Sequence, residues 1–123
     1  MTTMDVISAY GMAWNADEIE RRKLLDLAWA DEGVYCDPIG HANGREALIT
    51  HIGGAQAAFP GHRLELVSGV DEHDGQFRFA WELRGPDGAT VIEGVDFGVL
   101  GSDGRIQSIT GFFGQLPPCE VEG

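Results

Sequence analysis

Three Asp-Gly pairs in the second half of the chain constrain its fold more than any other feature of the sequence. Each pair separates two runs that are rich in apolar and β-branched residues. An Asp-Gly pair in that setting predicts a β-hairpin, because both positions tolerate the positive φ angles of a tight turn. Three hairpins in series therefore predict four consecutive antiparallel strands. The turns are Asp74-Gly75, Asp87-Gly88 and Asp103-Gly104, and the strands are residues 62–70, 76–84, 89–100 and 105–113.

The first third of the chain carries helical patterns instead. Apolar residues recur at spacings of three and four over residues 6–14, which predicts an amphipathic helix. Asp17 followed by Glu20 predicts the N-terminal cap of a second helix. We expect that helix to carry Trp29 on its inner side and to end at Gly33.

A short strand and a third helix follow. Residues 34–37 have the composition of a strand, which Pro38 stops. Asn43 followed by Glu46 predicts the cap of a helix that ends before Pro60. Because the helices precede the strands instead of alternating with them, we expect an α+β fold with helices on one face of a sheet.

Length and charge limit the functions that are open to this chain. Its 123 residues have room for one domain, expected over residues 1–114 with a tail at 115–123, and 43% of them are hydrophobic. The chain has 8 basic and 20 acidic residues, a net charge of −12, which disfavours nucleic acid and anionic membranes as partners. Cys36 and Cys119 make no disulfide framework and no signal peptide is visible, so we expect a cytoplasmic protein with free thiols.

One carboxylate stands on an apolar face of a predicted strand. Alternation over residues 91–100 places Asp96 on the same side as an isoleucine and two glycines. A carboxylate in such a place is costly unless it is paired, which indicates a functional site. The alternatives are a salt bridge to Arg78 or Arg105, or an outward-facing position at a dimer contact.

Two other residues are candidates to act with Asp96. Tyr10 lies on the apolar face of the first helix, and Asp37 ends the short strand. Burial favours the neutral form of a carboxyl group, which can then donate a hydrogen bond as a tyrosine does. Two such donors on one oxygen form an oxyanion site, and a separate ionised carboxylate can move a proton. Alternatively, Tyr10 is an ordinary core residue and Asp37 accepts backbone N–H groups in its turn.

The order of these residues resembles that of the ketosteroid isomerases, which belong to the SnoaL-like and nuclear-transport-factor-2-like superfamily. The matching segments, spread over residues 6–114, are Tyr10-x4-Asn15, Asp37-Pro38-Ile39-Gly40, Asp96-Phe97 and Phe113-Gly114. The resemblance implies a cone-shaped, curved antiparallel sheet with three N-terminal helices around an apolar pocket. By similarity, Asp37 is the base, and Tyr10 and Asp96 donate to the oxyanion.

The resemblance also implies an isomerase or cyclase that moves a proton on a small apolar carbonyl compound without a cofactor. The residues expected to line its pocket are Trp14, Phe59, Trp81, Ile109 and Phe113. The alternative is a non-catalytic ligand-binding or dimerisation domain of the same fold. Epoxide hydrolysis would need an arginine between two carboxylates, for which Arg78 is the one substitute.

Two further expectations concern metals and self-association. The four histidines lack the spacing of metal ligands, so no metal site is expected. Val95 and Phe97 alternate with Asp96 and therefore face the other side of the sheet. An apolar outer face predicts a homodimer.

Overall fold

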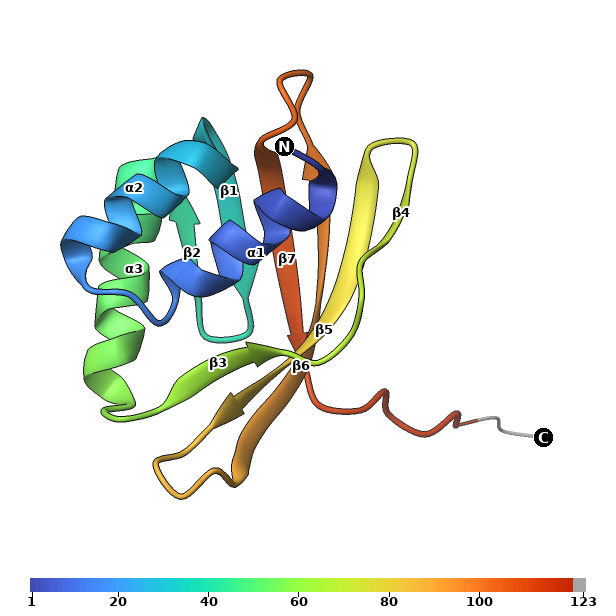
Figure 1. The fold of residues 1–123 in the computed structure, drawn as a ribbon. Coiled ribbons are helices and arrows are strands. Elements are labelled where there is room, and N and C mark those ends of the chain that lie inside the picture. The colour runs from blue at the N-terminus through green and yellow to red at the C-terminus, as the bar shows by residue number, and fades with distance from the viewer. Residues whose placement is uncertain (121–123) are drawn as a thin grey trace.

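Three helices lie against one face of a curved, seven-stranded sheet (Figure 1). The structure is a computed structural model that describes residues 1–120 of the chain. The helices are α1 (Thr3–Ala13), α2 (Glu18–Ala28) and α3 (Arg45–Ala58). The strands are β1 (Trp29–Asp37), β2 (Gly40–Asn43), β3 (Arg63–Leu66), β4 (Asp71–His73), β5 (Gln76–Arg84), β6 (Thr90–Leu100) and β7 (Ile106–Phe113). The predicted α+β architecture is confirmed.

The sheet is mixed, whereas the sequence predicted an antiparallel one. Its strand order is β2-β1-β7-β6-β5-β3, and β4 also pairs with β5. The strands β3 to β7 pair antiparallel, as the Asp-Gly turns predicted. β1 pairs parallel with β7, with Tyr35 opposite Ile109. A parallel pair requires a long crossover connection, which here contains α3 and the strands β2 to β6.

The three Asp-Gly pairs all lie in turns between antiparallel strands. Asp74 and Gly75 have φ angles of 52° and 74°, and together they form the tight turn between β4 and β5. The other two loops are longer, and in them the glycine takes the positive φ, 83° at Gly88 and 82° at Gly104. The hairpin prediction is therefore confirmed at each pair.

The strand predicted over residues 62–70 is shorter in the structure: β3 covers Arg63–Leu66, and β4 begins only at Asp71, beyond the predicted bounds. Ser68 interrupts it, because the Ala80 N–H donates to the Ser68 hydroxyl at 2.7 Å in place of a backbone carbonyl. The Val67 N–H still donates to the Ala80 carbonyl at 3.0 Å. The chain bulges at this point and then returns to pair with β5.

The second helix ends at Ala28, earlier than the sequence predicted. Asp17 caps its start by accepting the Glu20 N–H at 2.9 Å. Trp29 already has extended angles, φ −116° and ψ 130°, and begins β1. Gly33 therefore lies within a strand, where its missing side chain leaves room for the Trp29 indole that a Cβ would strike.

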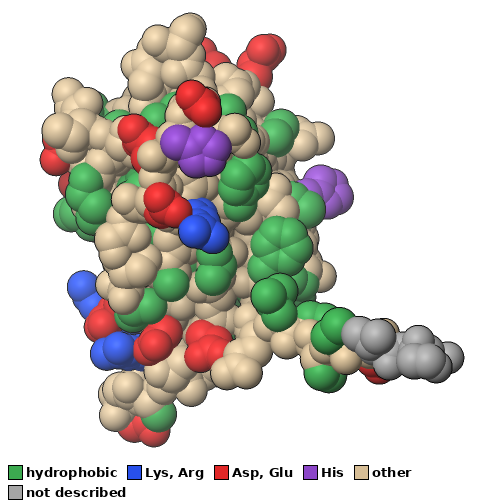
Figure 2. All heavy atoms as spheres, turned by 90° about the vertical axis from the view of Figure 1, so that its right-hand side faces the viewer, with side chains coloured by type: hydrophobic (Ala, Val, Ile, Leu, Met, Phe, Trp, Pro, Cys, Tyr) green, Lys and Arg blue, Asp and Glu red, His purple; other side chains and the backbone are tan. Residues whose placement is uncertain are grey.

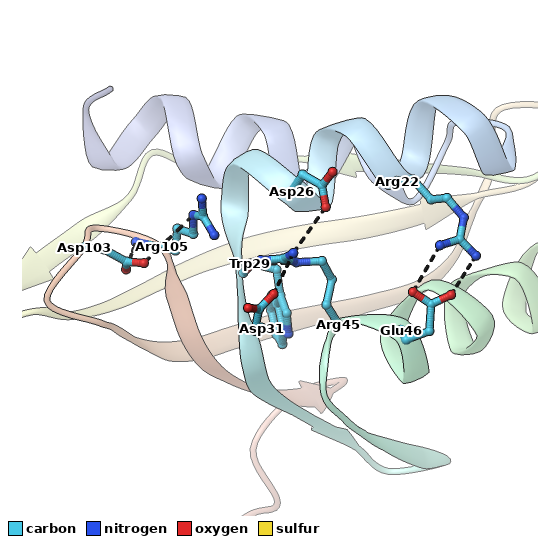
Figure 3. A network of polar contacts seen from close by, with 8 residues as sticks. All are labelled: Arg22, Asp26, Trp29, Asp31, Arg45, Glu46, Asp103 and Arg105. Atoms are coloured by element: carbon cyan, nitrogen blue, oxygen red, sulfur yellow. Dashed lines mark hydrogen bonds and ion pairs between the residues drawn. The ribbon is translucent and has the colours of Figure 1, made fainter.

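The third helix begins without the predicted cap. Its N-cap is Gly44 in place of Asn43, and no side chain caps it. The Glu46 carboxylate instead accepts two hydrogen bonds from the guanidinium of Arg22 in α2, at 2.7 and 3.0 Å (Figure 3). This exposed bidentate pair links α2 to α3.

A second polar cluster lies where α2 passes into β1 (Figure 3). The Arg45 guanidinium donates to the Trp29 carbonyl at 2.6 and 3.0 Å. It also pairs with Asp26 and Asp31 at 3.2 and 2.8 Å. The two acids are exposed, so each ion pair contributes about 1 kcal/mol at most, and the bonds to the backbone carbonyl fix the geometry.

Glycines on β6 admit aromatic rings from β5. Phe77 and Trp81 point into the core and pair with Gly98 and Gly94. A Cβ at either glycine would strike the facing ring. Asp96 lies between the two glycines on the same inner face and is 5% exposed. The prediction that Asp96 faces inward is thus confirmed.

Arg21 of α2 is buried without an acidic partner among the described residues. Its guanidinium donates to the Gln56 side chain at 2.7 Å and to the carbonyls of Ile49 and Ala16 at 3.3 Å. Gly53 of α3 lies against it, since a Cβ there would be 3.1 Å from Arg21 Nη1. Gly53 therefore makes room for a cation, and α3 continues through it without a break.

The outer face of the sheet exposes large apolar side chains. Val95, Phe97 and Phe112 are all exposed, by 43% to 62%. Figure 2 shows one side of the molecule, on which hydrophobic side chains lie among a few acidic, basic and histidine side chains.

Residues 114–120 extend away from the domain (Figures 1 and 2). Leu116 in this segment is 93% exposed. The last three residues of the predicted tail lie outside the described residues. Cys36 and Cys119 are free and exposed. None of the described helices has the length and hydropathy to cross a membrane.

Candidate active site

A cavity of about 360 Å³ lies between the helices and the inner face of the sheet. Tyr10, Asp37 and Asp96 all line it, so the structure brings the three predicted catalytic residues to one hollow. Of the five residues that were predicted to line a pocket, four do so. These four are Trp14, Phe59, Trp81 and Phe113.

Ile109 is the exception. It lies on the inner face of β7, as predicted, but is 1% exposed and is not part of the cavity wall. It pairs with Gly98 of β6 and Tyr35 of β1. It also lies two positions before Gly111, the glycine that pairs with Asp96. Its side chain therefore belongs to the core next to the cavity.

Asp96 is held by an indole. The Trp81 Nε1–H donates to Asp96 Oδ1 at 2.9 Å. Arg78 and Arg105 both contact exposed acids instead, so the alternative of an ion pair to either is wrong. Burial raises the pKa of Asp96 to about 7, although the Trp81 hydrogen bond lowers it, and the nearby charge of Asp37 raises it further. Asp96 is thus partly protonated near neutral pH.

The two carboxyl groups approach each other across Gly111 of β7. Gly111 pairs with Asp96 on one side, and β1 runs along its other side. A Cβ built on Gly111 would be 2.8 Å from Asp96 Oδ1 and 3.5 Å from Asp37 Cβ. The missing side chain therefore lets Asp96 and Asp37 both lie close to the backbone of β7.

Tyr10 reaches the cavity from α1. It is 1% exposed, and its ring stacks on Trp29 with centroids 5.6 Å apart. Burial, followed by the charge of Asp96, raises the pKa of Tyr10 well above its usual value. The phenol therefore stays protonated at neutral pH and is available as a hydrogen-bond donor.

Both carboxylate oxygens of Asp37 already accept hydrogen bonds. The Ile39 N–H donates to Oδ1 at 2.8 Å, which is the turn role considered from the sequence. The Tyr35 hydroxyl donates to Oδ2 at 2.5 Å. His51 Nε2 lies 3.8 Å from the same oxygen. Asp37 is thus a fixed carboxylate at the cavity wall.

Tyr35 and His51 were not singled out from the sequence. Tyr35 precedes Asp37 by two residues, so the period of a strand places both on one side of β1, and that spacing was a usable signal. Burial above all raises the pKa of Tyr35, which keeps its hydroxyl a donor. His51 packs against the rings of Tyr35 and Trp14, with centroids 5.2 and 6.0 Å away, and no motif marks it.

The other polar residues of the cavity wall support the fold. Asn15 exchanges two hydrogen bonds of 2.8 Å with the backbone of Leu64. The Gln56 amide donates to the carbonyls of Trp14 and Ala16. Within residues 1–120 no group of three or more metal-ligating side chains occurs, and no arginine lines this cavity. The described residues therefore do not provide the arrangement that epoxide hydrolysis needs.

The model of the SnoaL-like domain matches residues 7–109 of the sequence. The chain belongs to the SnoaL-like family. A candidate isomerase of this family from Agrobacterium tumefaciens str. C58 has a solved structure and is 36% identical to this SnoaL-like protein. The match covers 94% of this chain and 100% of that chain, with a TM-score of 0.87. No curated protein matches the sequence.

More distant structures share the fold. A candidate polyketide cyclase from Sinorhizobium meliloti is 17% identical, over 90% of this chain and 99% of that chain, with a TM-score of 0.69. A candidate SnoaL-like polyketide cyclase from Jannaschia sp. CCS1 is 15% identical, over 90% and 84%, with a TM-score of 0.72. At such identities the similarity establishes the fold alone.

Proposed function

We propose that this SnoaL-like protein is a cofactor-independent proton-transfer enzyme, an isomerase or cyclase that acts on a small apolar carbonyl compound. The observation that carries the proposal is the position of Tyr10, Asp37 and Asp96 on one largely apolar cavity, with both acids close to Gly111. The burial of Asp96, which raises its pKa, supports a division of labour between the two acids.

In this mechanism Asp37 takes a proton from a carbon next to the substrate carbonyl. The electron pair of the broken C–H bond moves onto the carbonyl oxygen, which becomes an enolate. The Tyr10 hydroxyl and the protonated Asp96 donate hydrogen bonds to that oxygen. The proton on Asp37 then returns to another carbon, which gives an isomer. Alternatively, the enolate carbon attacks a second carbonyl and closes a ring, and the alkoxide formed on that carbonyl takes up the proton from Asp37.

The relatives support the general class of reaction. The Agrobacterium protein is described as a candidate isomerase, and two relatives of the same fold as candidate polyketide cyclases. Both reactions pass through an enolate, so one oxyanion site would serve either.

The test uses a β,γ-unsaturated ketone such as 3-cyclohexenone, whose conversion to the conjugated enone is followed by absorbance. Asp37→Asn removes the base, while its amide oxygen can still accept the Ile39 N–H and its NH2 group can donate to the Tyr35 oxygen. Turnover should therefore fall by at least about 100-fold. Glu72→Gln on the exposed strand β4 makes the same chemical change far from the cavity and should leave turnover unaltered. Equal turnover in wild type and Asp37→Asn would remove Asp37 from the mechanism.

One observation favours a second function, a non-catalytic small-ligand-binding domain. Both oxygens of Asp37 already have donors, Ile39 and Tyr35, as a purely structural carboxylate would. The two functions differ in their preference for charge. An enzyme should bind 4-nitrophenolate, an oxyanion mimic, more tightly than a neutral ketone of similar size, whereas an apolar binding pocket should show no such preference.

We also propose that the protein forms a homodimer through the outer face of the sheet. Val95, Phe97 and Phe112 expose apolar surface there, and such surface commonly pairs with a second copy. Phe97→Glu should shift the protein to the monomer in sedimentation velocity experiments. A wild-type protein that sediments as a monomer would contradict the proposal.

A further inference from the structure

Trp81 occupies a site that the sheet has shaped for it. On β5 it pairs with Gly94, and a Cβ at that glycine would strike the indole ring. On its other side the ring of Phe113 stands almost perpendicular to it, at an angle of 86° and with centroids 5.6 Å apart. Trp81 is 7% exposed. The indole is therefore held in one orientation by its neighbours.

That orientation directs the indole N–H at Asp96. The Trp81 Nε1–H donates to Asp96 Oδ1 at 2.9 Å. Trp81 is the one described residue that hydrogen-bonds this carboxyl group. The bond occupies Oδ1, so Oδ2 is the oxygen that remains for a proton and for a ligand in the cavity. An indole donates only, so it always leaves the proton of a neutral Asp96 on the other oxygen.

We infer that Trp81 is a positioning residue that fixes the carboxyl group of Asp96 and reserves Oδ2 as the donor to a ligand oxygen. This inference rests on the proposed role of Asp96 as an oxyanion donor. It assigns to Trp81 a function beyond that of one apolar residue among several in the cavity wall.

The pKa of Asp96 depends on the titratable groups around it as well as on the Trp81 hydrogen bond. The titratable side chains that share its cavity are Tyr10 of α1, Tyr35 and Asp37 of β1, His51 of α3, and His62, which lies between α3 and β3. The described residues of β5 and β7 add no titratable group to this wall. Burial and then Asp37 raise the pKa of Asp96, and the Trp81 hydrogen bond lowers it because it stabilises the carboxylate.

The first arm of the experiment follows Asp96 alone and needs no substrate. The side-chain carboxyl carbons of aspartate are labelled with ¹³C, and the Asp96 signal, assigned by its loss in Asp96→Asn, is titrated by NMR. Trp81→Phe keeps a buried ring and removes the N–H, so the midpoint should move upward from about pH 7 by about one unit. Benzothienylalanine at position 81 keeps the shape of indole without the N–H and should give the same shift, which guards against misfolding of Trp81→Phe.

The matched control is Trp29→Phe. Trp29 is equally buried, its Nε1 has no hydrogen-bond partner, and it does not line the cavity. That variant should leave the Asp96 midpoint in place. An unchanged midpoint in both Trp81 variants overturns the inference, because a residue that only fills space would behave in that way.

The second arm measures binding of 2,4-dinitrophenolate, a more acidic phenol that is still an anion at a pH where Asp96 is protonated in every protein compared. A loss of about tenfold in affinity in Trp81→Phe then reports orientation and not charge. If wild type binds the phenolate and Trp81→Phe binds it equally well, the positioning role is wrong while the proposed function stands. If wild type shows no preference for the phenolate, the proposed oxyanion site fails, and the NMR midpoints still decide whether Trp81 holds Asp96.

Discussion

The Tyr35 hydroxyl donates a hydrogen bond of 2.5 Å to Oδ2 of Asp37, two residues further along the same strand. Both side chains point to the inner face of β1, and β1 is held between β2 and β7. The orientation of the proposed base is therefore set by a strand inside the sheet, together with the Ile39 N–H of the following turn.

Tyr35→Phe should lower kcat for ketone isomerisation by about tenfold and leave KM nearly unchanged. The variant removes one hydrogen bond to a charged group, which is enough to loosen the base, while the apolar ring that faces the substrate remains. Steady-state kinetics with 3-cyclohexenone provide the measurement. A rise in KM at constant kcat would show instead that Tyr35 binds substrate.

Because of Asp96, the free energy of unfolding should fall as the pH rises. Its pKa is 3.8 in the unfolded chain and about 7 in the fold, so the folded protein binds the proton more tightly, and this contribution is lost between about pH 4 and pH 7. Asp96→Asn does not ionise and can still accept the Trp81 N–H. Relative to wild type, it should gain up to about 4 kcal/mol in the free energy of unfolding between pH 4 and pH 8. Urea unfolding at both pH values tests this, and a constant difference between the two proteins would contradict it.

Gly111→Ala should disturb the site and the fold together. The new Cβ would lie 2.8 Å from Asp96 Oδ1, so β6 or β7 must shift, at a cost of about 1–3 kcal/mol. Binding of 4-nitrophenolate should fall with it. Gly54→Ala is the control for stability alone, because Gly54 lines the cavity but a Cβ there meets nothing within 4 Å inside α3. It should stabilise the protein by about 0.5–1 kcal/mol, and equal effects at the two glycines would refute the steric account.

Arg21→Lys should destabilise the protein by about 2 kcal/mol. The planar guanidinium reaches three acceptors, two in α3 and one in the loop between α1 and α2, and one ammonium cannot serve them all. Arg22→Lys on the next position changes an exposed ion pair and should cost less than about 0.5 kcal/mol. Thermal unfolding of the two variants gives the comparison. Equal melting temperatures would mean that the Arg21 contacts contribute nothing.

The features of the fold that depend on neighbours in sequence were predictable. Asp-Gly turns report local backbone angles, and alternation in β6 placed Asp96 on the inner face because a strand has a fixed period of two. The helical face of residues 6–14 likewise placed Tyr10 inward. The helix boundary near Trp29 was wrong, because the space at Gly33 serves a tertiary contact and not a helix end.

The contacts that complete the site join segments far apart in the chain, and no local pattern reports them. The Trp81–Asp96 bond depends on the register between β5 and β6, and the approach of His51 to Asp37 depends on how α3 lies over β1. The parallel pairing of β1 with β7 has the same origin. Only the resemblance to a family anticipated that Tyr10, Asp37 and Asp96 would share one hollow.

The pairing of β1 with β7 also governs when this protein can fold during synthesis. Residues 29–36 have their sheet partner in residues 106–110, which are synthesised only after α3 and the strands β2 to β6. Until β7 is synthesised, β1 has β2 on one side and an open edge on the other. The early part of the chain therefore stays incompletely folded, or is shielded by a chaperone. A nascent chain that stops before β7 therefore lacks the neighbouring strand of β1, and with it part of the scaffold that orients Asp37.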